Sequence, residues 1–212
     1  MQRRLIGLDL DNTIIDYERA FAPVAEEMGL IPKGSDLASK ADVKAALRRG
    51  AGEEAWMRLQ GQMYGRYIER ATPYPDVAEF IAAVISQGAR VVIVSHKTQF
   101  GHFDTARIDL HEAALGWLDR RGFFTKNGLD RADVYFEETR GGKLARIAQI
   151  GCDTFVDDLP EVFHDPEFPN TAGKLWFAGD RPEEDGGGLK AYRSWRQLLD
   201  IVMLMPLGDS AA

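Results

Sequence analysis

The sequence has little of three things that mark particular classes of protein. It contains one cysteine, Cys152, in 212 residues, so no internal disulfide can form and nothing indicates an oxidising compartment. No apolar run approaches the roughly 20 residues of a membrane-spanning helix. There is no run of lysine and arginine, and the formal net charge is −7, which disfavours binding to nucleic acid polymers. We therefore expect a cytoplasmic protein that binds neither membranes nor nucleic acid polymers.

Short apolar runs alternate with segments of helical spacing along most of the chain. Strands are predicted at 4–9, 89–95, 133–138, 153–158 and 174–180, and helices near 76–88, 105–121, 143–150 and 194–205. Strands that alternate with helices are typical of a parallel sheet covered on both faces. The sequence therefore predicts an α/β fold, with a Rossmann-like parallel sheet core and helices on both faces.

The interval 16–72 breaks this alternation, because it carries helix signals and no clear strand. Ser39 and Asp42 have the spacing of a capping box ahead of an alanine-rich segment. Apolar residues at helical spacing follow at Trp56, Leu59, Met63 and Tyr67. A connection of this length within a compact domain is better explained by a small helical insertion than by a structureless loop. We predict a core of residues 1–15 and 73–212 with a helical insertion at 16–72.

Polar residues follow three of the predicted strands. Asp9 and Asp11 come at the end of the first strand, Ser95 ends the second, and Asp157 and Asp158 end the fourth. Parallel strands bring their carboxyl ends to one edge of the sheet, where ligands bind. Carboxylates gathered there would repel one another, and a hard divalent cation such as Mg2+ would hold them together.

The same groups suit phosphoryl transfer. A carboxylate can attack phosphorus, and a second carboxyl group nearby can protonate the leaving oxygen and then activate water. A hydroxyl at Ser95 and a positive charge at Lys143 could bind the phosphoryl group. Arg140 and Lys126 are competing candidates for that charge.

The segment Asp9-Leu10-Asp11-Asn12-Thr13 matches the DxDxT signature, and Ser95, Lys143 and the acidic pair Asp157-Asp158 follow in order. With these motifs the chain resembles the phosphatase-type members of the haloacid dehalogenase-like (HAD) superfamily. The resemblance implies that Asp9 is the nucleophile and a Mg2+ ligand. It makes Asp11 the general acid/base, with its backbone carbonyl on the metal. Further implied roles are phosphate binding by Ser95, Lys143 and Thr13, metal binding by Asp158 and Asp157, and a cap domain at 16–72.

A carboxylate at Asp11 is typical of the family's phosphatases and phosphomutases and disfavours dehalogenation. We expect a Mg2+-dependent phosphatase of a small phosphate ester, a sugar phosphate or a nucleoside monophosphate, that acts as a monomer or homodimer. The alternatives are a phosphomutase and a non-catalytic phosphate-binding protein. His96 and Lys97 depart from the small residue or asparagine expected after Ser95. They are candidate substrate contacts, and an ordinary surface loop is the competing interpretation.

Overall fold

The computed structural model describes residues 3–205. The chain divides into two compact units. The first, here called the sheet unit, comprises Met1–Ile14, Pro73–Lys97 and Arg121–Ala212. The second, the helical unit, comprises Ile15–Thr72 and Thr98–Arg120. No helix in the part of the chain that the structure describes is both long and apolar enough to cross a membrane.

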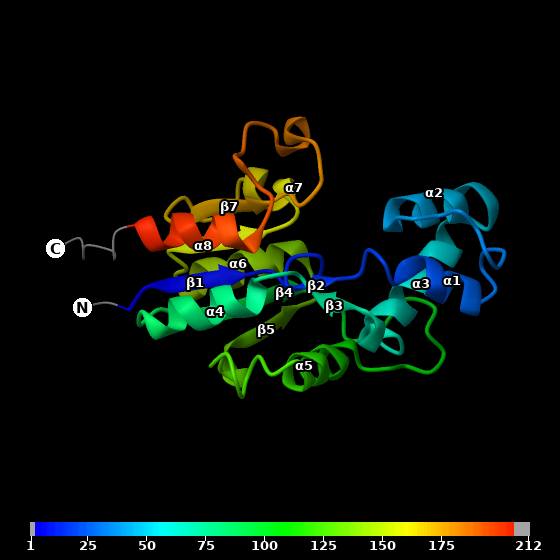
Figure 1. The fold of residues 1–212 in the computed structure, drawn as a ribbon, viewed down its shortest axis with the longest axis horizontal. Helices are drawn as coiled ribbons and strands as arrows, with labels where there is room; N and C mark the ends of the chain where they lie inside the picture. Colours follow the sequence, from blue (N-terminus) through cyan, green and yellow to red (C-terminus); the bar gives the residue numbers. More distant parts are fainter. Residues whose placement is uncertain (1–2, 206–212) are drawn as a thin grey trace. The chain divides into compact units, whose positions relative to one another are not determined.

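The sheet unit is built on a parallel sheet of six strands in the order β5-β4-β1-β6-β7-β8, and the arrows of β1, β4 and β5 point the same way (Figure 1). The strands are β1 (Leu5–Leu8), β4 (Arg90–His96), β5 (Val134–Glu137), β6 (Thr154–Asp157), β7 (Gly173–Phe177) and β8 (Ala191–Tyr192). Leu8 of β1 lies opposite Ile93 of β4 and Val156 of β6. The first strand in the sequence is therefore a central strand of the sheet.

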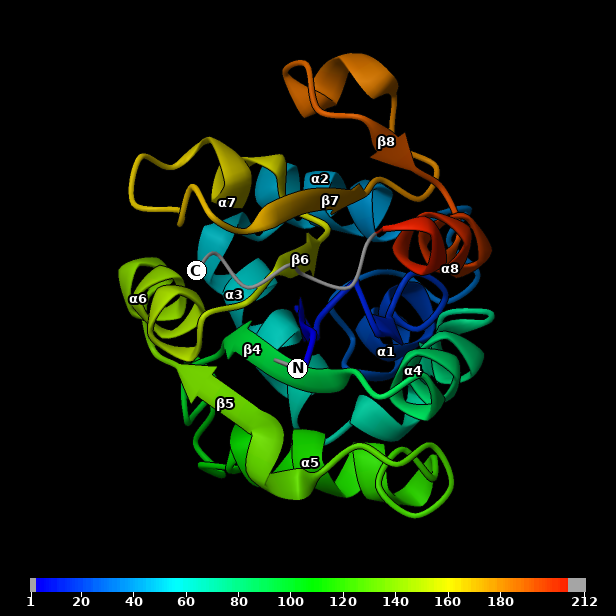
Figure 2. The same cartoon turned by 90° about the vertical axis from the view of Figure 1, so that its left-hand side faces the viewer.

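Helices cover both faces of this sheet, as the α/β prediction requires. Figure 2 shows α4 (Val77–Ser86) and α8 (Trp195–Leu204) on one face, and α6 (Arg140–Ile150) and α7 (Pro160–His164) on the other. Under the first pair, the ring of Phe80 meets Trp195 edge to face at 4.9 Å. Under the second pair, Phe155 packs so closely on β1 that a Cβ at Gly7 would lie 2.4 Å from its ring. The buried apolar side chains between these layers form the core.

All five strands predicted for the core are present, with ends that shift by a few residues, so the predicted fold class is confirmed. Four predicted helices correspond to α4, α6, α8 and α5 (Leu110–Arg120). Strand β8 was not predicted, because two residues carry no periodic signal.

The helical unit contains α1 (Phe21–Glu27), α2 (Lys40–Gly50), α3 (Gly52–Tyr64), a 3-10 turn η1 (Ile68–Arg70) and α5. The capping box predicted at Ser39 and Asp42 is present at the start of α2. On α3, Trp56, Leu59 and Met63 are buried, and Trp56 stacks on Phe21 at 5.2 Å. The helix ends at Tyr64, so Tyr67 lies beyond it. Two short strands, β2 (Ile15–Asp16) and β3 (Thr72–Pro73), pair with each other.

The helical unit also includes Thr98–Arg120, a segment predicted from the sequence to belong to the α/β core. Gln62 donates to Asp104 Oδ1 at 2.8 Å, and the Trp117 indole donates to the Ala71 carbonyl at 3.2 Å. Gly61 and Gly101 approach so closely that a Cβ at Gly101 would lie 2.8 Å from the Gly61 Cα. Segments some 40 residues apart are therefore packed into one body.

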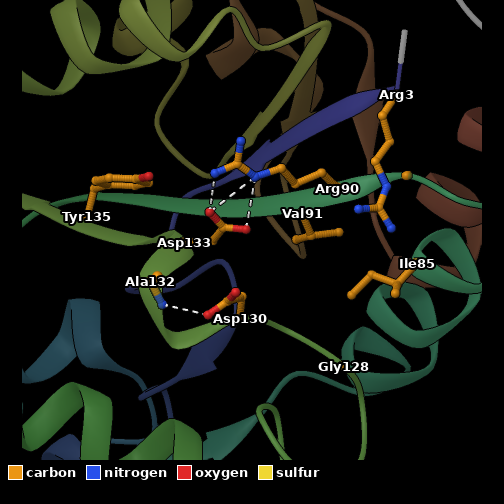
Figure 3. A pocket seen from close by; sticks show the side chains of 10 residues that line it. Arg3, Ile85, Arg90, Val91, Gly128, Asp130, Ala132, Asp133 and Tyr135 are labelled. Atoms are coloured by element: carbon orange, nitrogen blue, oxygen red, sulfur yellow. Dashed lines mark hydrogen bonds and ion pairs between the residues drawn. The ribbon is translucent and has the colours of Figure 1, made fainter. Parts of the chain in front are cut away.

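A cavity of about 500 Å³ opens at the amino ends of β4 and β5. Figure 3 shows Arg90 and Asp133 paired in its wall, with Arg90 Nε 3.0 Å from Asp133 Oδ2. This pairing raises the pKa of Arg90 above its ordinary value. Asp130 accepts a hydrogen bond from the Ala132 amide at 2.9 Å. Both acids thus have partners, and the residues predicted to carry chemistry follow the opposite ends of the strands.

Candidate active site

The candidate site lies at the carboxyl edge of the sheet, where β1 is flanked by β4 and β6. Asp9 directly follows β1, and its amide donates to the Val156 carbonyl at 2.9 Å, which extends the pairing with β6. Asp157 ends β6, and Ser95 is the sixth residue of β4. The chain winds from β1 outward to β4 and β5 and then returns to β6 on the other side of β1. Such a reversal is where α/β sheets bind ligands.

Lys143 brings Asp9 and Asp157 together. It lies on the first turn of α6, whose N-cap Thr139 accepts a hydrogen bond from the Gly142 amide at 3.0 Å. Its Nζ atom lies 2.6 Å from Asp9 Oδ1 and 2.6 Å from Asp157 Oδ2. All three side chains are buried. A buried ammonium needs such partners, because its desolvation is otherwise very costly.

Burial and neighbouring charges shift the pKa values of Asp9 and Lys143. Burial raises the pKa of Asp9, and the charge of Asp157 adds to this, so that the pKa reaches about 7 despite the opposing effect of Lys143. Burial lowers the pKa of Lys143, but the two carboxylates outweigh it and hold that pKa above its ordinary value. Lys143 is therefore a permanent cation next to a carboxyl group that ionises near neutral pH.

Asp9, Asp157 and Asp158 form a group of buried carboxylates that each offer an oxygen within 4.8 Å of the others. Oxygen donors of this kind are the ligands that Mg2+ prefers. Asp157 already accepts from Lys143 and, through Oδ1, from the Leu159 amide at 2.9 Å. Asp158 Oδ2 lies 3.6 Å from Arg181 Nη2. The three carboxylates together form a donor set that fits a magnesium ion.

The turn after Asp9 places the other residues of the DxDxT motif. Asn12 has a left-handed backbone, with φ of 62°, a conformation that asparagine tolerates better than most residues. Thr13 is buried, and its hydroxyl donates to Asp9 Oδ2 at 3.2 Å. The Thr13 carbonyl accepts from the Trp195 indole at 3.1 Å. Thr13, predicted as a phosphate-binding residue, therefore contacts the carboxylate of Asp9 in the structure.

The end of β4 supplies three neighbouring polar side chains with different surroundings. Ser95 is buried, and its hydroxyl has no hydrogen-bond partner among the residues that the structure describes. His96 is exposed, with Nε2 3.1 Å from the Glu138 carbonyl. Lys97 is buried, and its Nζ lies 2.7 Å from Asp11 Oδ2. The two candidate substrate contacts thus differ: His96 lies at the surface and Lys97 pairs with an acid of the motif.

Arg181 is a residue of the site that was not predicted from the sequence. Its guanidinium donates to the backbone carbonyl of Asp158, which also accepts from the Trp176 indole at 3.1 Å. The sequence held one signal, because Arg181 directly follows the predicted strand 174–180 and so had to lie at the same edge.

Comparisons with known proteins support this fold. No family model matches the chain, and no curated protein matches its sequence. Among solved structures, a haloacid dehalogenase-like hydrolase from Streptococcus pneumoniae aligns with a TM-score of 0.60 at 14% identity, over 94% of this chain and 98% of that chain. The HAD-hydrolase YfnB from Bacillus subtilis, bound to magnesium, aligns with a TM-score of 0.57 at 14% identity, over 95% and 99%.

A predicted phosphoglycolate phosphatase from Haemophilus somnus gives a TM-score of 0.55 at 16% identity, over 95% of this chain and 99% of that chain. These likenesses extend over nearly the whole length of both chains, so they include the helical unit as well as the sheet. At identities this low, the structural alignments establish the fold alone, and the reaction has to be inferred from the residues of the site. The chain has the fold of the haloacid dehalogenase-like hydrolases.

Proposed function

We propose that the protein is a Mg2+-dependent phosphatase of a small phosphorylated metabolite and that it acts through an aspartyl phosphate on Asp9. The observation that carries this proposal is the group of three neighbouring carboxylates, Asp9, Asp157 and Asp158, two of which, Asp9 and Asp157, pair with the Lys143 ammonium. Asp11 follows two residues after Asp9. It supplies the acid/base group that a phosphatase needs, and its carboxylate argues against dehalogenation.

The reaction has two steps. Asp9 attacks the phosphorus atom, the bond from phosphorus to the ester oxygen breaks, and Asp11 gives its proton to that oxygen. Water then attacks the phosphorus of the aspartyl phosphate, and Asp11 takes the proton of that water. The bond from phosphorus to Asp9 breaks, which releases inorganic phosphate and restores both carboxyl groups.

Other residues of the chain prepare this exchange. Lys143 places positive charge beside Asp9, and the buried Ser95 hydroxyl is a hydrogen-bond donor for a phosphoryl oxygen. A magnesium ion held by Asp9, Asp158 and the Asp11 carbonyl, with support from Asp157, would supply further positive charge to the phosphoryl oxygens. Thr13 holds the Asp9 carboxylate in place through its hydroxyl.

We place this activity in the cytoplasm, where a lone buried thiol stays reduced. The substrate class that we propose is a sugar phosphate or a nucleoside monophosphate. In the proposal the helical insertion at 16–72 acts as the cap that selects this substrate, in a monomer or homodimer.

The test is phosphate release from a panel of sugar phosphates, nucleoside monophosphates and other small phosphate esters. Each compound is run with Mg2+, with EDTA and with the Asp9→Asn variant. Asp119→Asn, a change at an exposed aspartate, serves as the matched control. We expect release from one compound class that EDTA and Asp9→Asn abolish and Asp119→Asn leaves intact.

Other outcomes would contradict the proposal in distinct ways. Near-normal turnover by Asp9→Asn would exclude the covalent mechanism. Isomer interconversion primed by a bisphosphorylated sugar would identify a phosphomutase. Silence of the folded, magnesium-bound protein across the whole panel would favour the non-catalytic alternative.

A further inference from the structure

Lys97 is a second buried lysine of the site, with a different partner from Lys143. It follows the last residue of β4, and its amide donates to the Glu137 carbonyl at the end of β5 at 2.9 Å. Its backbone is therefore fixed to the sheet edge. Its side chain is 1% exposed, and its Nζ lies 2.7 Å from Asp11 Oδ2.

The two lysines divide the acids of the motif between them. Lys143 contacts Asp9 and Asp157, whereas Lys97 contacts Asp11. Asp11 comes after the strand has ended and before the left-handed turn at Asn12, so the sheet pairing of β1 does not include it. Its side chain is 14% exposed. An ion pair to a rigid strand end is a means of fixing the direction of such a carboxyl group.

A direct role of Lys97 in substrate binding fits the geometry less well. Its Nζ atom is itself buried, and it already lies at ion-pair distance from Asp11. A cation that selects the substrate has to offer its charge to a group that arrives from solvent. The exposed neighbour His96 has that accessibility, and Lys97 does not.

We propose that Lys97 is a positioning residue that orients the Asp11 carboxyl group for proton transfer to the leaving oxygen. This inference rests on the proposed phosphatase function, which gives Asp11 its role. Proton transfer requires the donor to lie within hydrogen-bond reach of the oxygen that it protonates. Misplacement of a reacting group by about 1 Å can cost on the order of 100-fold in rate. Loss of Lys97 should therefore slow the step that uses this proton.

The leaving group provides a test that a merely structural role would not affect. p-Nitrophenolate departs from phosphorus without protonation, whereas the alkoxide of an alkyl phosphate needs a proton. We therefore compare kcat/KM of wild type and Lys97→Met on p-nitrophenyl phosphate and on glycerol phosphate, since kcat/KM reports the first, bond-breaking step. We expect Lys97→Met to lower kcat/KM about 10-fold to 100-fold on the alkyl ester and less than about threefold on the aryl ester.

A double-mutant cycle makes the assignment specific. Asp11→Asn removes the proton donor, so adding Lys97→Met to it should cause no further loss on the alkyl ester. Lys190→Met, at an exposed lysine, is the matched control and should change neither value. Thermal unfolding establishes that each variant is folded, and Lys97→Gln replaces Lys97→Met if the methionine variant does not fold.

Equal losses on both esters would overturn the inference, and so would a further loss in the double variant. A rise in KM with unchanged kcat on both esters would make Lys97 a substrate-binding residue instead. If wild type releases phosphate from neither ester nor from any compound of the panel, the phosphatase proposal itself has failed. If wild type is active and Lys97→Met has the same kcat/KM as wild type on both esters, the positioning role is excluded and the phosphatase proposal stands.

Discussion

Lys143 donates to Asp9 at 2.6 Å, and both side chains are buried. The same ammonium also lies 2.6 Å from Asp157 Oδ2, so a single cation serves two buried carboxylates. Removing one partner of a buried ion pair destabilises a protein far more than replacing both partners, because the remaining charge is left buried without its counterion.

Replacement of Lys143 by methionine keeps most of the apolar stem and removes the charge. We expect the free energy of unfolding of the metal-free protein at pH 8 to fall by about 3–5 kcal/mol. Urea unfolding measures this change. Lys126→Met, at an exposed lysine, should change it by less than about 0.5 kcal/mol. Equal free energies of unfolding for Lys143→Met and Lys126→Met would show that Lys143 does not stabilise the charges of Asp9 and Asp157.

The buried Ser95 hydroxyl should lower the free energy of unfolding and raise kcat. Its buried hydroxyl lacks a partner among the described residues, and an unsatisfied hydroxyl costs about 1–3 kcal/mol. We expect Ser95→Ala to raise the free energy of unfolding by about 1 kcal/mol and to lower kcat about 100-fold. Urea unfolding and phosphate release measure the two effects. Ser86→Ala, on an exposed turn of α4, should leave kcat unchanged, and a destabilised Ser95→Ala variant would contradict the interpretation.

Magnesium binding should depend on pH through Asp9. Its pKa of about 7 means that the carboxyl group holds a proton below pH 7, which a metal ion must displace. The affinity should therefore fall by up to about tenfold for each pH unit below 7 and level off above it. Calorimetric titration with Mg2+ in buffers of different ionisation enthalpy measures both the affinity and the proton released. In Asp9→Asn the release should vanish, and its persistence would point to another titrating group.

Cys152 should be unreactive until the protein unfolds. The residue is 3% exposed, and burial raises the pKa of its thiol to about 12. Because the thiolate is the reactive form, a disulfide reagent at pH 8 should label the native protein slowly and the urea-unfolded protein at once. The time course of labelling across a urea series measures this. Rapid labelling without urea would mean that this part of the sheet unit opens locally.

The strands that the sequence predicted are those with enough residues to show a pattern. The strands β1, β4, β5, β6 and β7 contain four to seven residues each, and most have β-branched residues between clear helix signals. The two-residue strands β2, β3 and β8 could not be predicted, because their pairing depends on what the rest of the fold brings alongside. The shortest elements are the ones that tertiary structure decides.

Order along the chain was sufficient to place Asp9, Ser95 and Asp157 at one edge of the sheet. It could not reveal that Lys97 turns to Asp11, or that the Thr13 hydroxyl faces Asp9, because side-chain direction beyond a strand end follows from the turn and the local packing. The sequence also gave no sign that Gly101 meets Gly61. Glycine carries no apolar pattern, so a close backbone contact between distant segments leaves no periodic signal.

The helical unit is built from two separate segments of the chain, and this restricts how either segment can change in evolution. The chain passes between the units at four points, and each segment supplies partners to the other. Exchange of 16–72 alone with a relative that has no acid at position 69 would deprive Arg120 of its partner Glu69. A side chain gained at Gly61 would strike the backbone of Gly101. Changes in one segment therefore require matching changes in the other, although 25 residues of the sheet unit, 73–97, separate the two segments in the sequence.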